Sequence, residues 1–391
     1  MSADDHSKPP AHAAEPVWLE LFFDLVYVTA ILLFSTGVAE ELANEEAVSH
    51  IAELVGLFVG VWWIWVLTTL YANRFPHNDT THRLLVLSQM FFVTVFAMSA
   101  REGVHENAVW VSASFAILCA ITATMYFRER HAPGTQGAIA RSRSIHLVVA
   151  ALIFGVSIFF TGAPEIVLWV IGLLVIVIPS RVGPDRITDL TPLNKEHIAE
   201  RMGALTIIVC GEAFVKVASS ATRGTMGDVE MGALALEFLL VFALWWSYFD
   251  DIPQAGISPP RFLPWLWGHL VLQLGLAATA IGVGEFVTSK GLAFLPEGAI
   301  IPVAASIAIA IGAIALIGMC THRQPKRGLL VLRTCAAALV IIVGTVAWAI
   351  PFVRLIAGLL VVTIVVVVQA ILTDRILRKT SVVKEKISID E

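Results

Sequence analysis

Glu20 and Asp24 are acidic residues four positions apart in the apolar stretch that follows Pro16. Residues four apart share one face of a helix, so the two carboxylates point to the same side. Asp24 lies roughly 12 Å along a helix that begins at Pro16, which in a membrane places it below the lipid headgroups. An unpaired carboxylate there must take up a proton or find a partner. Glu20 lies in the first turn, where the helix dipole by itself accounts for an acid.

His197, Glu200 and Arg201 form a second set, spaced so that they share one helical face. A His-x-x-Glu pair can ligate a metal, and the same spacing is typical of the salt-bridged start of an interfacial helix. Glu212 follows about three turns later on nearly the same face. It stands next to a glycine that allows another helix to approach closely, with Lys216 one turn further as a local counter-charge.

The remaining candidates lie in or at the ends of other apolar stretches. Asp79 is a natural helix cap, whereas His82 and Gln89 share a face that capping does not explain. Arg83 either extends to the membrane interface or provides the counter-charge for Asp24. The other candidates are Asp250, for which an interfacial acid is the alternative, His269, for which a histidine bonded to a backbone carbonyl is the alternative, and Glu285, about four turns beyond His269.

The elements that position these residues are apolar and numerous. Apolar residues make up 57% of the chain and charged residues 15%, against about 25% charged residues in soluble proteins. About 20 apolar residues in a helix cross a bilayer, and twelve such stretches fill the chain. They cover approximately 17–39, 51–72, 81–101, 107–127, 145–162, 165–180, 197–218, 231–250, 263–288, 298–320, 329–349 and 351–373. We therefore predict an all-α polytopic transmembrane bundle of about 12 helices, or eleven if the last two stretches form one helix kinked at Pro351.

Composition and motifs also limit the classes of partner and cofactor that we expect. The net charge of −5 and the lack of a Gly-rich phosphate loop indicate neither a nucleic-acid partner nor a nucleotide-hydrolysing motor. The bilayer is the expected environment, we expect no cofactor, and a homodimer is left open. The four cysteines stand singly in apolar stretches, so we interpret them as small buried residues: Cys119, Cys210, Cys320 and Cys335.

Basic residues are distributed unevenly between the alternate loops. With twelve spans both termini lie on one side, and all but five of the 26 Lys and Arg residues fall there. The exceptions are Arg101, Lys216, Arg223, Lys290 and Arg354. The positive-inside rule therefore predicts cytoplasmic termini, with the acidic loop at 40–46 outside.

The two halves of the chain resemble each other. Trp62-Trp63 and Trp245-Trp246 each precede a basic loop and then a helix with a histidine, His82 or His269. This pattern predicts two parallel six-helix repeats, with sites between them. The expected organisation is a cytoplasmic tail at 1–16, a first repeat at 17–180, a linker at 181–196, a second repeat at 197–373 and a cytoplasmic tail at 374–391.

Four motifs resemble a known family. The sequences Leu-Glu-Leu-Phe-Phe-Asp-Leu from Leu19, Asn-Asp-Thr-Thr-His-Arg from Asn78, His-Ile-Ala-Glu-Arg-Met-Gly from His197 and Trp-Trp-Ser-Tyr-Phe-Asp from Trp245 are similar to those of the bacterial low temperature requirement protein A family. The resemblance implies a multi-pass protein of the bacterial inner membrane. It maps the family's motif positions onto Glu20, Asp24, His82, Arg83, His197, Glu200, Arg201, Glu212, Asp250, His269 and Glu285. The chain departs from the family at Phe75-Pro-His-Asn-Asp, where a more acidic run is expected.

A fainter resemblance links Phe22-Phe-Asp to the Phe-Ser-Asp first-helix signature of endolysosomal potassium channels, with Phe23 in place of the serine. The leading hypothesis is a secondary transporter or an ion or proton pathway that uses the intramembrane acids and histidines, with protons or small cations as cargo. A membrane-embedded enzyme that uses the same groups is the rival. A non-catalytic membrane scaffold is the third reading.

Overall fold

The computed structural model describes residues 18–41, 47–77, 79–101, 107–178, 193–221, 231–250, 259–288, 300–321, 327–350 and 356–390. These residues form twelve α-helices and no strand, which confirms the predicted all-α polytopic bundle. The helices are α1 Trp18–Glu41, α2 Ala47–Arg74, α3 Thr80–Arg101, α4 Ala108–Arg128, α5 Thr135–Ser157, α6 Ala163–Val177, α7 Lys195–Ala221, α8 Met231–Phe249, α9 Pro259–Thr288, α10 Ile300–Thr321, α11 Arg327–Ala349 and α12 Ile356–Asp390.

Most of the described helices are long and apolar enough to cross a membrane. Eight of them meet both conditions, namely α2 to α5 and α9 to α12. Two shorter apolar helices belong to α6 and α8. The remaining two, α1 and α7, carry the acids and bases of the candidate site. The chain is thus a multi-span membrane protein.

The side chains are arranged as expected for a bundle in lipid. On α3, Leu84, Leu87 and Phe91 are 57%, 55% and 61% exposed, whereas Gln89 is fully buried. Gln89 donates hydrogen bonds to the hydroxyls of Thr68 and Thr122, which lie on the two neighbouring helices. Apolar residues therefore face the lipid and polar residues link helices inside the bundle.

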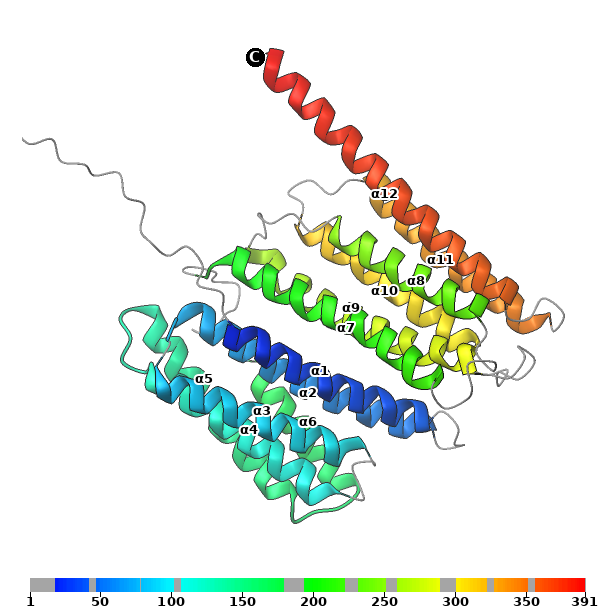
Figure 1. Cartoon of the computed structure of the whole chain (residues 1–391). Helices are drawn as coiled ribbons and strands as arrows, with labels where there is room; N and C mark the ends of the chain where they lie inside the picture. The colour runs from blue at the N-terminus through cyan, green and yellow to red at the C-terminus, as the bar shows by residue number, and fades with distance from the viewer. Residues whose placement is uncertain are drawn as a thin grey trace, which may run out of the picture.

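The helices gather in two halves, α1–α6 and α7–α12, which occupy opposite sides of the molecule (Figure 1). In the first half α1 packs on α3, and α3, α4, α5 and α6 pack in sequence. The second half repeats this order of neighbours, with α7 on α9 followed by α10, α11 and α12. This order supports the predicted repeat, which a superposition of the two halves will test.

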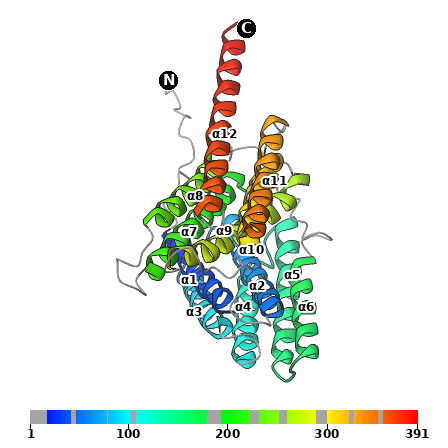
Figure 2. The same cartoon turned by 90° about the vertical axis from the view of Figure 1, so that its right-hand side faces the viewer.

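Helix α5 begins earlier than the sequence predicts, and helix α12 ends later, because it continues to Asp390, beyond the predicted residue 373. Helix α5 begins at Thr135, ahead of the predicted residue 145, because it continues into a polar first part that hydropathy does not detect. Helices α11 and α12 are separate and pack side by side (Figure 2), so the single kinked helix is excluded. The predicted helix start at Pro16 lies outside the described residues.

Small residues permit the closest helix contacts. At Gly275 on α9, an added Cβ would lie 3.1 Å from the backbone nitrogen of Ala310 on α10. One turn further, the hydroxyls of Thr279 and Ser306 lie 3.0 Å apart and connect the same two helices. Close packing of this kind is what holds helices together where lipid offers no hydrophobic driving force.

The cysteines depart from the prediction at one position. All four are free; Cys119, Cys210 and Cys320 are buried as expected, but Cys335 is exposed on α11. An apolar thiol is tolerated on a lipid-facing surface, which the sequence pattern alone does not distinguish from a buried one.

Candidate functional site

Helices α1 and α7, the first helices of the two halves, lie side by side at the boundary between them (Figure 1). Helix α1 carries Glu20 and Asp24, and α7 carries His197 and Arg201. These four side chains meet at the boundary, and we call them the interface cluster.

Acids and bases pair across this boundary. His197 Nε2 lies 3.0 Å from Glu20 Oε2. Arg201 Nη2 lies 2.8 Å from Asp24 Oδ1, and Arg201 Nε lies 3.4 Å from Glu20 Oε2. One guanidinium is therefore shared by two carboxylates.

The pairing follows from the register of the two helices. Glu20 and His197 are 177 residues apart, and Asp24 and Arg201 have the same separation. The first residues of α1 and α7, Trp18 and Lys195, are also separated by that number. Four residues advance about 6 Å along either helix, so matching positions of two parallel helices carry complementary side chains.

Asn73, at the end of α2, fixes the hydrogen bonds of His197. Its Oδ1 accepts from the backbone N–H of Asn194 at 2.9 Å, and its Nδ2 donates to the Asn194 carbonyl at 2.9 Å. The amide cannot flip without losing both bonds. The second hydrogen on Nδ2 therefore points to His197 Nδ1, 3.0 Å away. His197 must accept at Nδ1, so the neutral ring carries its proton on Nε2 and donates it to Glu20.

Asn194 caps the start of α7 and so positions His197 for its contact with Asn73. Its Oδ1 accepts from the backbone N–H groups of Glu196 and His197, at 3.1 and 3.2 Å. Asparagine is a preferred residue at this position because its side chain satisfies N–H groups that the first turn leaves open. The cap therefore sets where His197 lies relative to α1 and α2.

Asp24 is the most enclosed member of the cluster. Its side chain is fully buried, whereas that of Glu20 is 16% exposed. Trp65 on α2 donates its indole N–H to Asp24 Oδ1 at 2.7 Å, and the Arg201 guanidinium lies 5.6 Å from the Trp65 ring. Oδ1 thus accepts two donors, while Oδ2 has no hydrogen-bond partner among the described residues.

The charges in the cluster do not balance. The ionisable groups that act on Asp24 are those of Arg201, Glu20 and His197. Arginine keeps its charge in proteins, and a His197 ring that accepts from Asn73 at Nδ1 carries one proton and no charge. With both acids ionised, the cluster contains two negative charges and one positive charge.

Glu200 does not join the cluster, contrary to the expectation from its spacing. Its side chain is exposed, whereas Arg201 is buried. One residue turns an α-helix by about 100°, so only one of the two neighbours can face α1. Arg83, which the sequence offered as a counter-charge for Asp24, is also exposed. Arg201 fills that role instead.

His82 belongs to a different arrangement at the start of α3. Asp79 Oδ1 accepts the backbone N–H of His82 at 2.6 Å, and Asp79 Oδ2 accepts from Arg128 at 2.5 Å. These two hydrogen bonds lower the pKa of the Asp79 carboxyl. The His82 ring stacks on Tyr71, with ring centroids 5.9 Å apart. Capping therefore accounts for Asp79, while Asn78 lies outside the described residues.

His269 is held inside the second half. It is fully buried, with Nδ1 2.8 Å from its own helix at the Trp265 carbonyl and Nε2 3.0 Å from the Tyr248 hydroxyl. A carbonyl only accepts, so Nδ1 donates and Nε2 accepts from the tyrosine. This is the carbonyl-bonded alternative that the sequence left open, and both bonds go to residues outside the interface cluster.

The other predicted residues are distributed more widely. Glu212 is buried further along α7, and Asp250 is exposed just after α8. The side chain of Glu285 lies outside the described residues. The structure thus brings together Glu20, Asp24, His197 and Arg201, but not the other predicted residues whose side chains it describes.

Three polar residues were missed by sequence reasoning. Trp65 and Asn73 contact the cluster from α2, and their positions eight residues apart on one helix are the signal that could have identified them. Glu237 on α8 is fully buried, and neither carboxylate oxygen has a hydrogen-bond partner among the described residues. An acid inside an apolar run is itself a signal.

Among the described residues, no three His, Cys, Asp or Glu side chains are grouped so that they could hold a metal ion. The His-x-x-Glu spacing of α7 does not form such a group in this part of the chain. His197 binds Glu20 and Asn73 instead, and Glu200 points away.

Comparison with known proteins covers most of the chain. A family profile described as bacterial low temperature requirement A protein matches residues 17–372. An uncharacterized protein of Rhizobium meliloti (strain 1021) is 25% identical over 289 residues, which cover 67% of each chain.

Proposed function

This chain belongs to the bacterial low temperature requirement A family, and from that premise we propose that it is a secondary transporter or an ion or proton pathway of the bacterial inner membrane. One observation carries the proposal: a buried acid, Asp24, and a buried arginine, Arg201, meet the partly exposed acid Glu20 between the halves of a multi-span membrane protein. A charge inside a membrane costs several kcal/mol, about 2.5–3.5 on insertion scales, and such charges usually mark an ion pathway. Transporter sites typically lie between internal repeats.

The charge imbalance supports a cation or proton as cargo. Two carboxylates share one guanidinium, so the cluster lacks one positive charge when both acids are ionised. Leaving a buried charge uncompensated is strongly unfavourable. A proton or a monovalent cation bound between Glu20 and Asp24 completes the balance.

Asp24 Oδ2 is the best atom to receive that charge. It is buried and has no hydrogen-bond partner among the described residues, whereas Oδ1 is already occupied by Trp65 and Arg201. A transport site must both bind and release its ion. The less buried Glu20 provides the route by which the cluster exchanges with the aqueous side.

Glu212 extends the pathway along α7. It lies about 16 Å beyond Arg201 along the helix axis, at 1.5 Å per residue, and it is buried. A second buried acid at a different depth gives a proton or cation another binding position toward the membrane middle.

Ion and proton flux into liposomes that contain the purified protein tests this function. Asp24→Asn and Glu212→Gln keep side-chain size and remove charge, so we expect each to reduce flux to the level of empty liposomes. Glu200→Gln is the matched control, because it removes an exposed acid beside Arg201 and should leave flux unchanged. Flux that survives both buried substitutions would contradict the pathway, and misfolding of both variants would show that these two acids are structural.

We propose that the termini face the cytoplasm, since the loops on their side hold most of the basic residues. Labelling of intact cells with a membrane-impermeant thiol reagent tests this orientation in a variant whose four native cysteines are replaced by alanine. Glu45→Cys should be labelled, and Thr135→Cys should not. The reverse pattern would require the opposite orientation.

A further inference from the structure

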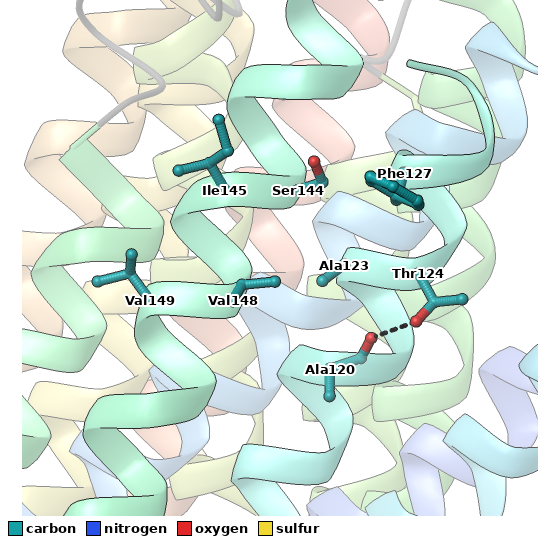
Figure 3. Close-up of a pocket in the computed structure, with 8 residues that line it drawn as sticks. All are labelled: Ala120, Ala123, Thr124, Phe127, Ser144, Ile145, Val148 and Val149. Atoms are coloured by element: carbon teal, nitrogen blue, oxygen red, sulfur yellow. Dashed lines mark hydrogen bonds between the residues drawn. The ribbon is translucent and has the colours of Figure 1, made fainter. Parts of the chain in front are cut away.

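A cavity of about 480 Å³ lies between α4 and α5 (Figure 3), and no residue of the interface cluster lines it. Alanine and serine side chains line it together with larger apolar ones: Ala120, Ala123, Thr124 and Phe127 from α4, and Ser144, Ile145, Val148 and Val149 from α5. Phe127, Ile145 and Val148 are 52%, 61% and 49% exposed, so the cavity opens on the lipid-facing surface. It is therefore a groove, and we call it the α4–α5 groove.

The walls of the groove match an extended hydrocarbon chain. The α4 residues repeat every three or four positions and therefore form one stripe, and the α5 residues do the same. The two hydroxyls bond within their own helices, Thr124 to the Ala120 carbonyl at 2.8 Å and Ser144 to the Arg141 carbonyl at 2.9 Å. The walls thus offer an occupant apolar contact and little hydrogen bonding.

Two arginines stand at one end of the groove. Arg130 lies just beyond α4, with its guanidinium 4.0 Å from the centre of the Phe127 ring. Arg141 lies one turn before Ile145 on α5 and donates to the Arg130 carbonyl at 2.7 Å. The Arg130 guanidinium donates to the Phe127 carbonyl at 3.0 Å. Both side chains are thereby fixed at the point where the apolar stripes end.

Neither arginine has an acidic partner among the described residues. The other charged groups nearby are already paired, Arg128 with Asp79 and Glu129 with His77. Each guanidinium has five N–H groups and uses one of them in these contacts, so most remain available to an anion. An apolar groove that ends in two unpaired arginines is complementary to a molecule with an anionic head and a hydrocarbon tail.

We infer that the α4–α5 groove is a binding site for an anionic glycerophospholipid. One acyl chain lies between the stripes of α4 and α5, and the phosphate binds Arg130 and Arg141. From Arg141 to Val149 the α5 wall extends about 12 Å, which suits the first part of an acyl chain below its phosphate. Basic sites between transmembrane helices at the cytoplasmic side bind such headgroups. The site is independent of the proposed transport function.

Native mass spectrometry of the purified full chain with added phosphatidylglycerol tests the inference, with phosphatidylcholine as the uncharged comparison. We expect tight binding of phosphatidylglycerol alone. Arg130→Gln with Arg141→Gln should weaken it about 30-fold, since each basic residue near a membrane surface contributes about a fivefold gain in affinity. Arg83→Gln, an exposed arginine outside the groove, should not change it.

A second pair of variants tests whether the acyl chain of the lipid occupies the α4–α5 groove. Ala120→Phe fills the exposed α4 wall and should weaken binding by at least about tenfold, whereas Ala338→Phe, on the exposed side of α11, should not. Equal binding of the two lipids, or wild-type binding by the arginine double variant, would overturn the site. Competition by glycerol 3-phosphate as effective as that by phosphatidylglycerol would show that no acyl chain is bound and would also overturn it.

Discussion

The interface cluster and the surroundings of His269 both contain a histidine between packed helices, but His197 is 22% exposed and His269 is fully buried, and the two rings are held differently. His197 bonds a carboxylate on one side and a fixed amide on the other, next to a shared guanidinium. His269 bonds a backbone carbonyl and a tyrosine hydroxyl inside the second half. Each ring accepts a hydrogen bond at one nitrogen and donates at the other, yet only His197 contacts a carboxylate. The position between the halves, not the residue type, separates a candidate ion site from a link between helices.

The strongest test of this difference removes the shared cation. Arg201→Gln leaves the buried Asp24 and the partly exposed Glu20 without a counter-charge, so we expect a loss of about 3–5 kcal/mol in stability, mainly from Asp24. Thermal unfolding in detergent micelles measures it. Adding Asp24→Asn to this variant should restore part of the stability, because it removes one uncompensated charge. A double variant no more stable than Arg201→Gln would contradict the pairing.

Two tryptophans of α2 allow a hydrogen bond to the interface cluster to be compared with one outside it. Trp65 donates to the carboxylate of Asp24 at 2.7 Å, and Trp63 donates to the backbone carbonyl of Ile176 at 3.0 Å. Trp65→Phe removes a hydrogen bond to a charged group, which contributes about 1.5–3 kcal/mol. Trp63→Phe removes a neutral one, which contributes about 0.6 kcal/mol between membrane helices.

The two tryptophan variants should differ more in ion or proton flux than they do in stability. In liposomes, Trp65→Phe should change ion or proton flux because it alters the donors on Asp24, whereas Trp63→Phe should transport like the wild type. If the two variants lose stability and flux equally, the cluster has no special role.

The smallest effect is expected at His269. In His269→Gln, the amide oxygen can still accept the Tyr248 hydroxyl, so we expect a loss of only about 1 kcal/mol for the hydrogen bond to the Trp265 carbonyl. Thermal unfolding measures this loss, and flux in liposomes should stay at the wild-type level. A folded His269→Gln protein that no longer transports would place the pathway through the second half instead.

The sequence determined the membrane architecture because hydrophobicity is a local property. Apolar stretches of sufficient length predict helices wherever they occur, and the predicted bundle is confirmed. Local chemistry also determined the cap at Asp79, whose side chain bonds an amide three residues later. The start of α5 was predicted ten residues too late, because a helix that continues into the polar interface carries no hydropathy signal there.

Only the tertiary structure decided which ionisable residues meet. Spacing placed Glu20 and Asp24 on one face, and it did the same for His197, Glu200 and Arg201, but no local rule says which helix each face contacts. The parallel packing of α1 and α7 pairs residues 177 positions apart and leaves Glu200 exposed. Long-range packing likewise places Trp65 and Asn73 against the cluster. A helix fixes which of its own residues share a face, whereas the partner of that face depends on how all twelve helices share the limited buried surface.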